Sequence, residues 1–226
     1  MIVKSFELEK IKIKTSFFLF YGENQGHKNE IIKNKFQIKY KESTYKYDEN
    51  EILINKETFF NNILSKSFFE NEKLIIINRV TDKILDIVEE LIEKKIEDLL
   101  VILNANILEK KSKIRSLFEK SREATCVAFY EDNSQTLSNI VNIFFRSIKI
   151  PISQQAINLI VQRARGDRLN LSNELEKIKS YIGKKKKIEI VDILKLTNLA
   201  ENYNVSELVD SCLSKNKKKT INILNE

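Results

Sequence analysis

The sequence predicts an α/β domain with a parallel sheet, followed by a small all-helical domain. Three observations support this prediction. Four apolar runs occur in the first 130 residues, and none alternates between apolar and polar positions as a half-exposed strand does. Segments with helical spacing separate the runs, which is typical of layered α/β domains. Beyond residue 132 only helical patterns follow.

The predicted strands are short runs rich in large apolar residues. They span residues 17–21, 74–77, 99–103 and 125–130, and residues 44–48 are a further candidate. Helices are expected over residues 26–39, 58–64, 81–95 and 110–120. The third of these helices should begin at Thr81 or Asp82, since both residue types cap helices.

The helical region begins at the polar segment 131–134, where Glu131 and Asp132 are predicted to cap the next helix. Helices are expected over residues 134–147 and 190–199. Between them, one helix should run from the predicted cap Ser153 to Gly166–Asp167, and the next from there to Gly183. The helix before Gly183 carries an apolar stripe of Leu171, Leu175, Ile178 and Ile182.

These patterns predict three regions along the chain. Residues 1–132 form the α/β domain and residues 133–200 form the helical domain. Residues 201–226 form a linker and two helical segments, 205–214 and 217–225, which cannot bury their apolar faces alone. We therefore expect a third domain to begin here, and the chain to be a fragment or a truncated product.

The composition is that of a globular protein. The chain has 226 residues, of which 42% are apolar and 31% charged, and no apolar run approaches the roughly 18 residues of a membrane span. No signal peptide is recognisable, and Cys126 and Cys212 lie far apart, so a cytoplasmic location is expected. The net charge of +7 fits either an anionic partner or the lysine-rich bias of an AT-rich genome.

The segment after the first predicted long strand looks like a damaged phosphate-binding loop. A working P-loop separates its two glycines by four residues, and then places Lys and Ser or Thr at the start of a helix. Here Gly22 and Gly26 are one residue too close, Lys28 does not follow Gly26 directly, and Asn29 replaces the hydroxyl. Glu23 would repel a triphosphate. Gly22, Gly26 and Lys28 are therefore predicted to form a non-functional nucleotide loop.

No catalytic constellation is found in the sequence. His27 is the one histidine, which excludes a catalytic triad and a zinc cluster, and it is predicted to be a solvated loop residue. An ATPase also needs carboxylates at a strand end to hold magnesium, but the second strand ends at Asn78 and the third at Asn104. We therefore expect no catalytic residue, no metal and no cofactor.

The segment between the helix 58–64 and the next strand is the first candidate for binding. Leu64, Ser67, Phe68 and Phe69 place two adjacent aromatic rings at the polar end of a helix. An exposed aromatic pair marks a partner site, whereas a loop folded over the core would bury both rings. Both interpretations remain open at this point.

A run of lysines is the second candidate. It consists of Lys184, Lys185, Lys186 and Lys187, and residues 217–219 add three more lysines. They could contact phosphates, or they could form a solvated turn between helices. No aromatic residue interleaves with them, so a stacking platform for single-stranded nucleic acid is not predicted.

Taken in order, these segments resemble the delta subunit of the bacterial DNA polymerase III clamp loader. The resemblance covers essentially the whole chain. It rests on residues 19–24, 67–69 with 73–77, 99–103 with 108–113, Gly166–Asp167 with 173–178 and Tyr181, and 205–210.

The resemblance implies a degenerate RecA-like AAA+ domain, a helical lid and the start of a helical collar. It implies a subunit without ATPase function that opens the sliding clamp, contacting it through Ser67, Phe68 and Phe69 beside Leu64. ATPase relatives carry a nucleotide-sensing arginine where Leu169 stands here, with Arg168 one residue early.

The partners implied are the sliding clamp (the beta subunit), other loader subunits joined through the collar, and primed DNA. The chain would then be an accessory subunit of a DNA polymerase holoenzyme and no enzyme by its own residues. Two alternatives remain, a stand-alone nucleic-acid-binding protein and a divergent P-loop ATPase or nucleotide kinase.

Overall fold

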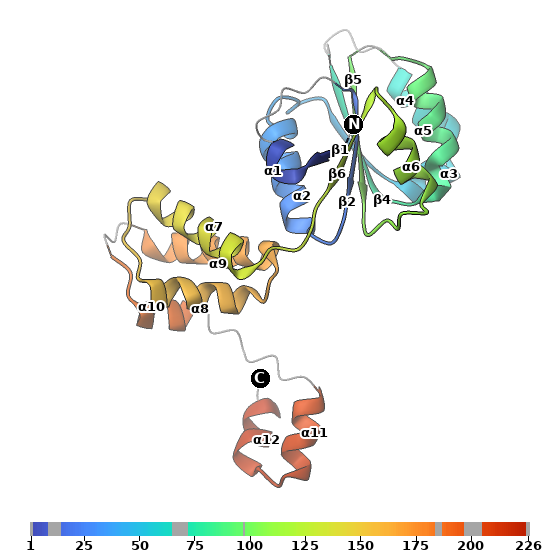
Figure 1. Cartoon of the computed structure of the whole chain (residues 1–226). Coiled ribbons are helices and arrows are strands. Elements are labelled where there is room, and N and C mark those ends of the chain that lie inside the picture. The colour runs from blue at the N-terminus through green and yellow to red at the C-terminus, as the bar shows by residue number, and fades with distance from the viewer. Residues whose placement is uncertain are drawn as a thin grey trace. The chain divides into compact units, whose positions relative to one another are not determined.

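The computed structural model describes residues 2–8, 15–64, 72–96, 98–183, 187–196 and 205–224. The chain divides into two compact units, Met1–Glu131 and Asp132–Glu226 (Figure 1). In this described part, none of the helices has the length and apolar character needed to cross a membrane.

The first unit is built around one parallel sheet, in which six strands are described. Their order across the sheet is β1-β6-β2-β5-β4-β3, and every neighbouring pair is parallel. The carboxyl ends of all the strands therefore meet at one edge. The strands are β1 (Ile2–Lys4), β2 (Phe17–Tyr21), β3 (Thr44–Asp48), β4 (Lys73–Val80), β5 (Leu99–Ala105) and β6 (Ala124–Ala128).

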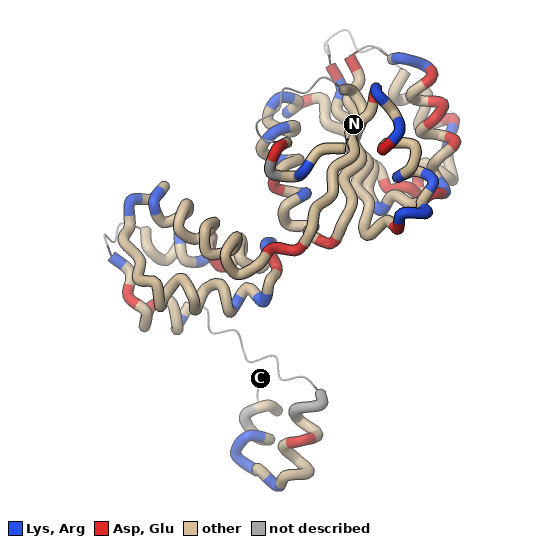
Figure 2. Tube along the Cα trace, viewed as in Figure 1, with Lys and Arg blue, Asp and Glu red and all other residues tan. Residues whose placement is uncertain are grey.

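Helices cover both faces of this sheet (Figure 1). On one face lie α1 (Ser5–Leu8), α2 (Gln25–Ile31) and a π-helix, η1 (Ile32–Gln37). On the other face lie α3 (Glu49–Ile54), α4 (Lys56–Leu64), the short 3₁₀ helix η2 (Asp82–Ile84), α5 (Leu85–Glu93) and α6 (Lys113–Lys120). Charged residues lie mostly on the helices and turns, whereas the strands are mostly uncharged (Figure 2).

Strand β2 explains why its sequence does not alternate. Leu19 belongs to the hydrophobic cluster on the α5 and α6 face, whereas Phe18 and Phe20 belong to the cluster on the α2 face. All five residues of β2 are buried. Burial of a Phe or Leu side chain contributes about 1.5–3 kcal/mol, so both faces of the strand select large apolar residues.

The predicted parallel α/β fold is confirmed, including the candidate strand 44–48. The predicted helical segment 26–39 is confirmed over residues 25–37, where the α-helix α2 continues into the π-helix η1. Ile31, Ile32 and Phe36 are all buried there, and the wider π-turn brings residues five apart onto one face. Strand β1 and helix α3 were not predicted, since three and six residues are too short for a clear period.

The second unit is helical in its described residues. Its helices are α7 (Ser134–Ser147), α8 (Gln154–Ala164), α9 (Arg168–Ile182), α10 (Ile190–Leu196), α11 (Val205–Leu213) and α12 (Lys217–Leu224). Residues of α7 to α10 share one apolar cluster, which includes the predicted stripe of α9. Helices α11 and α12 pack against each other.

Capping side chains set the helix starts in this unit. The Ser153 hydroxyl accepts a hydrogen bond from the Ala156 N–H at 3.2 Å, as predicted, and Asp167 caps α9. The prediction that Glu131 and Asp132 cap α7 was wrong. The Asn133 side chain caps α7 by accepting from the Thr136 N–H at 2.8 Å, because Asp132 is engaged elsewhere.

Candidate functional site

The loop between β2 and α2 lies at the carboxyl edge of the parallel sheet. This edge is where α/β sheets bind ligands. Gly22 leaves the strand with a φ of 120°, and a Cβ atom there would stand 2.2 Å from the Phe129 carbonyl oxygen. Only glycine therefore fits between β2 and the segment that follows β6.

Lys28 turns inward from the first turns of α2 and closes this loop. Its side chain is fully buried, and its Nζ donates hydrogen bonds to the carbonyl oxygens of Gly22 at 2.9 Å and Ala105 at 2.6 Å. Gly22 directly follows β2, and Ala105 is the last residue of β5. Burial lowers the pKa of Lys28 to about 8. The ammonium that a P-loop would direct at phosphate is thus engaged by the protein itself.

The inward position of Lys28 was not predicted from the sequence. The signal that could have indicated it is helical spacing, because Lys28, Ile31 and Ile32 follow the i, i+3, i+4 pattern of a buried face. A lysine on such a face is easily read as a solvated residue at the edge of the stripe. Which carbonyls it reaches depends on Ala105, 77 residues away.

The backbone of the loop is tied to the flanking segments. The Gly22 N–H donates to the Asn106 carbonyl at 3.0 Å, and the Asn24 N–H donates to the Phe129 carbonyl at 3.4 Å. The Asn24 side-chain amide also donates to the Tyr130 carbonyl at 3.0 Å. A phosphate cradle depends on backbone N–H groups that point at the ligand. Here these two N–H groups already have partners within the protein.

Asn24 also caps α2. Its Oδ1 accepts from the His27 N–H at 2.9 Å, and its carbonyl accepts from the Lys28 N–H at 3.1 Å. His27 therefore lies on α2, with its ring 5.1 Å from the Phe129 ring in an edge-to-face contact. The prediction of a solvated loop histidine was wrong, because the helix begins two residues before it.

The neighbouring strand ends carry amides in place of carboxylates. Asn78 of β4 and Asn104 of β5 are paired in the sheet, and the Asn104 Nδ2 donates to the Asn78 Oδ1 at 3.1 Å. Neutral amides supply no charge to balance magnesium. In the ranges given above, no group of three or more His, Cys, Asp or Glu is placed to hold a metal ion.

The two predicted binding segments are described only in part. Leu64 is the last residue of α4 and is 46% exposed, whereas Ser67, Phe68 and Phe69 lie outside the described residues. Lys184, Lys185 and Lys186 also lie outside them. Lys187 is exposed, and its ammonium pairs with Glu189 at 2.9 Å, which raises the pKa of Lys187.

The Gly166–Asp167 pair precedes a buried ion pair in the second unit. The Arg168 Nε and Nη2 donate to the two carboxylate oxygens of Asp132 at 2.7 and 2.8 Å. The two side chains are only 12% and 7% exposed. The neighbouring Leu169 is 46% exposed. The arginine nearest to the expected nucleotide-sensing position is therefore engaged with a carboxylate of its own unit.

No protein-family model and no curated protein matches the sequence, but solved structures match the fold. The Bacillus subtilis DNA clamp loader delta protein (YqeN) superposes with a TM-score of 0.58 over 97% of this chain and 68% of that chain, at 16% identity. The Thermotoga maritima RuvB Holliday junction branch migration motor superposes with a TM-score of 0.55 over 89% of this chain and 70% of that chain, at 11% identity. The chain therefore shares the fold of these two structures, a parallel sheet with helices on both faces followed by a helical unit.

Proposed function

We propose that this chain is the delta subunit of a bacterial DNA polymerase III clamp loader, which binds the sliding clamp and opens it for loading onto primed DNA. Two lines support the proposal. The segments that resemble this family occur in the family's order along the chain. The fold likeness to a clamp loader delta protein extends over 97% of the chain.

The closed nucleotide loop is the observation that carries the proposal. A motor of the AAA+ class needs a lysine and free N–H groups for phosphate and a carboxylate for magnesium. In this loop Lys28 is held by Gly22 and Ala105, and Asn78 stands at the strand end. Such a subunit would contribute binding rather than hydrolysis, and in this proposal it is an accessory to the polymerase holoenzyme in the cytoplasm.

The proposed clamp contact consists of Leu64, Ser67, Phe68 and Phe69. Leu64 ends α4, and Lys73 begins β4 at the amino edge of the sheet. The loop closed by Lys28 lies at the carboxyl edge, so clamp binding would not compete with it. Helices α11 and α12 would begin the collar through which other loader subunits assemble.

Replacement of the aromatic pair tests the proposal. The double variant Phe68→Ala, Phe69→Ala should bind the organism's own sliding clamp about 100-fold more weakly or worse. Aromatic anchors at an interface centre commonly cost about 2 kcal/mol or more each, and 1.4 kcal/mol is a factor of ten. Surface plasmon resonance measures the affinity, and the melting temperature of the same samples reports on folding.

Tyr130→Ala is the matched control, since Tyr130 is an aromatic side chain of the same unit that is 79% exposed. It should leave clamp affinity unchanged. If the double variant melts early but keeps its affinity per folded molecule, the rings belong to the core and the clamp assignment is wrong. DNA binding that is salt-dependent and needs no clamp would favour the nucleic-acid-binding alternative.

A nucleotide titration tests the other half of the proposal. Isothermal titration with Mg-ATP should give no heat of binding, because the phosphate-binding lysine is internally engaged and the strand-end carboxylate is replaced by Asn78. A P-loop ATPase titrated under the same conditions is the positive control. A micromolar dissociation constant for this chain would favour the divergent ATPase.

A further inference from the structure

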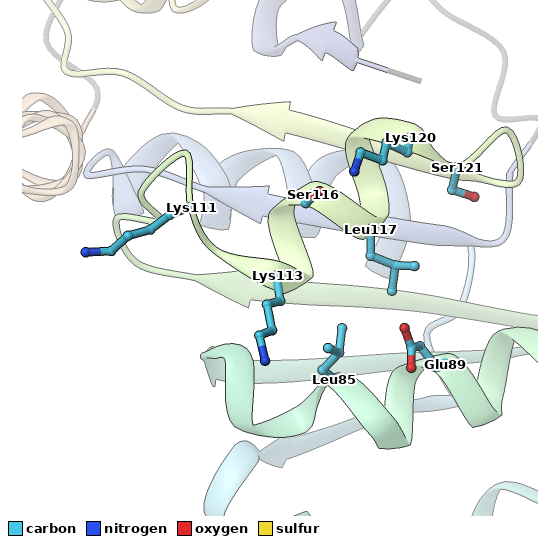
Figure 3. Close-up of a pocket in the computed structure, with 8 residues that line it drawn as sticks. All are labelled: Leu85, Glu89, Lys111, Lys113, Ser116, Leu117, Lys120 and Ser121. Carbon is cyan, nitrogen blue, oxygen red and sulfur yellow. The ribbon is translucent and has the colours of Figure 1, made fainter.

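A groove of about 610 Å³ runs between α5 and α6, on the face of the sheet opposite to α2 (Figures 1 and 3). It takes part in neither the closed loop nor the proposed clamp contact. In Figure 3 Leu85 of α5 and Leu117 of α6 project toward each other and form its apolar part. The lining is completed by Glu89, Lys111, Lys113, Ser116, Lys120 and Ser121.

The groove is held open by a fixed joint between its two walls. The Asp82 carboxylate accepts hydrogen bonds from the Ser112 hydroxyl at 2.7 Å, the Ile114 N–H at 3.0 Å and the Lys113 N–H at 3.1 Å. Partial burial alone would raise the pKa of Asp82, but these hydrogen bonds lower it. The start of α6 is thus attached to η2, which leads directly into α5. A preformed groove of this kind needs little reorganisation to bind a ligand.

Lysines with free charges stand at both ends of the α6 wall. Lys113 and Lys120 are seven residues apart, which is two helical turns or about 10 Å. Neither ammonium forms an ion pair with any described residue. Lys111, by contrast, pairs with Glu109 at 2.8 Å. Glu89 is exposed on the opposite wall, so the two walls differ in charge.

This pattern defines the chemistry of an occupant. A small anion bound by the lysines would leave the apolar part formed by Leu85 and Leu117 uncovered. Nucleic acid is disfavoured, because the apolar part consists of two leucines and the lining contains no aromatic ring on which a base could stack. An amphipathic helix fits both features, since it presents an apolar stripe beside charges repeated every seven residues.

We propose that the α5–α6 groove binds an acidic amphipathic helix of a partner protein. Its apolar stripe would cover Leu85 and Leu117, and two of its carboxylates, seven residues apart, would pair with Lys113 and Lys120. Glu89 would repel these carboxylates from the α5 wall and so fix the orientation of the bound helix. The proposal does not depend on the clamp-loader assignment.

A designed peptide tests this proposal on the full chain. The probe is a helical peptide with Glu at positions seven apart and Leu three and four residues after the first Glu, on an alanine background. The control peptide replaces each Glu by Lys. The acidic peptide should shift backbone amide resonances of α5 and α6 in NMR spectra, with affinity that falls as salt rises. The basic peptide should bind at least tenfold more weakly.

Charge reversal in the protein completes the test. The double variant Lys113→Glu, Lys120→Glu should weaken binding of the acidic peptide at least tenfold and improve binding of the basic one. The control variant Lys110→Glu, Lys217→Glu makes the same charge change at exposed lysines outside the lining and should bind like the parent chain. Equal melting temperatures of the variants would exclude misfolding as the cause.

Four results would overturn the proposal. The first is that the acidic peptide does not bind, and the second is that it shifts only amide resonances outside α5 and α6. The third is that the two peptides bind with equal affinity. The fourth is that both double variants lose the same affinity for the acidic peptide. Shifts of the same α5 and α6 amides by a single-stranded oligonucleotide, but not by the peptide, would assign the groove to nucleic acid instead. Concentration-dependent shifts without any peptide would assign it to a second copy of the chain.

Discussion

Lys28 carries a positive charge into the interior of the first unit. Among the residues that the structure describes, its hydrogen-bond partners are two backbone carbonyls, and burial lowers its pKa to about 8. The neutral amine keeps two N–H groups, so it can still donate to both carbonyls. Folding therefore favours deprotonation of this lysine, because the charged form loses its hydration without gaining a carboxylate.

This depressed pKa predicts an unusual pH dependence of stability. Between pH 8 and the unfolded pKa of about 10.4, the unfolded chain binds a proton that the folded chain has released. The free energy of unfolding should thus rise by about 2 kcal/mol from pH 7 to pH 9.5, relative to the variant Lys28→Met. Urea unfolding of the parent chain and of Lys28→Met at both pH values measures this difference in free energy. Every other titrating group is present in both proteins, so its contribution cancels in the comparison. Parallel pH profiles would show that Lys28 stays solvated.

At the level of secondary-structure elements, the Asp132–Arg168 pair joins the start of α7 to the start of α9. The bidentate geometry satisfies both carboxylate oxygens, and both side chains are largely buried. The pair therefore links two helices whose apolar stripes already share one core. Removal of one partner would leave a charge in a site with little access to water.

The variant Arg168→Ala should accordingly destabilise the second unit by about 3–5 kcal/mol. The double variant Asp132→Ala, Arg168→Ala should recover part of this loss, since it leaves no buried charge. Amide hydrogen exchange of α7 and α9 in the full chain measures the effect on this unit. Arg146→Ala is the matched control, because Arg146 is an exposed arginine of α7, and it should change stability by less than about 0.5 kcal/mol. Equal losses of stability in Arg168→Ala and Arg146→Ala would show that the Asp132–Arg168 pair does not stabilise this unit.

At the level of the whole molecule, the chain divides between Glu131 and Asp132. The segment between β6 and α7 has no helix or strand, and the composition changes there from alternating strands and helices to helices alone. The two units have separate hydrophobic cores. Each unit can thus keep its own packing when the connecting segment is cut.

Limited proteolysis should therefore cut first near residues 131–134 or in the predicted linker 202–204. Mass spectrometry of the products would identify either a fragment that ends near residue 131 or one that lacks the last helical pair. Residues 205–226 should be the less protected part, because α11 and α12 leave Leu213 and Leu224 exposed. A chain that resists cleavage at both places would behave as one fused domain.

Short-range patterns in the sequence predicted much of this architecture. The continuous apolar runs indicated strands buried on both faces, and Ser153 and Gly183 marked helix ends where the structure has them. These predictions succeed because periodicity and capping depend on residues within a few positions of one another.

Contacts between residues far apart in the sequence could not be predicted and are known only from the structure. The order of the six strands, the hydrogen bond from Lys28 to Ala105 and the partner of Arg168 join residues 25 or more positions apart. The α5–α6 groove likewise brings together two helices that are joined by hydrogen bonds from the start of α6 to Asp82, 30 or more positions away. No local pattern encodes such pairs. The sheet topology brings them together, and the desolvation that lowers the pKa of Lys28 arises only when the core has closed around it.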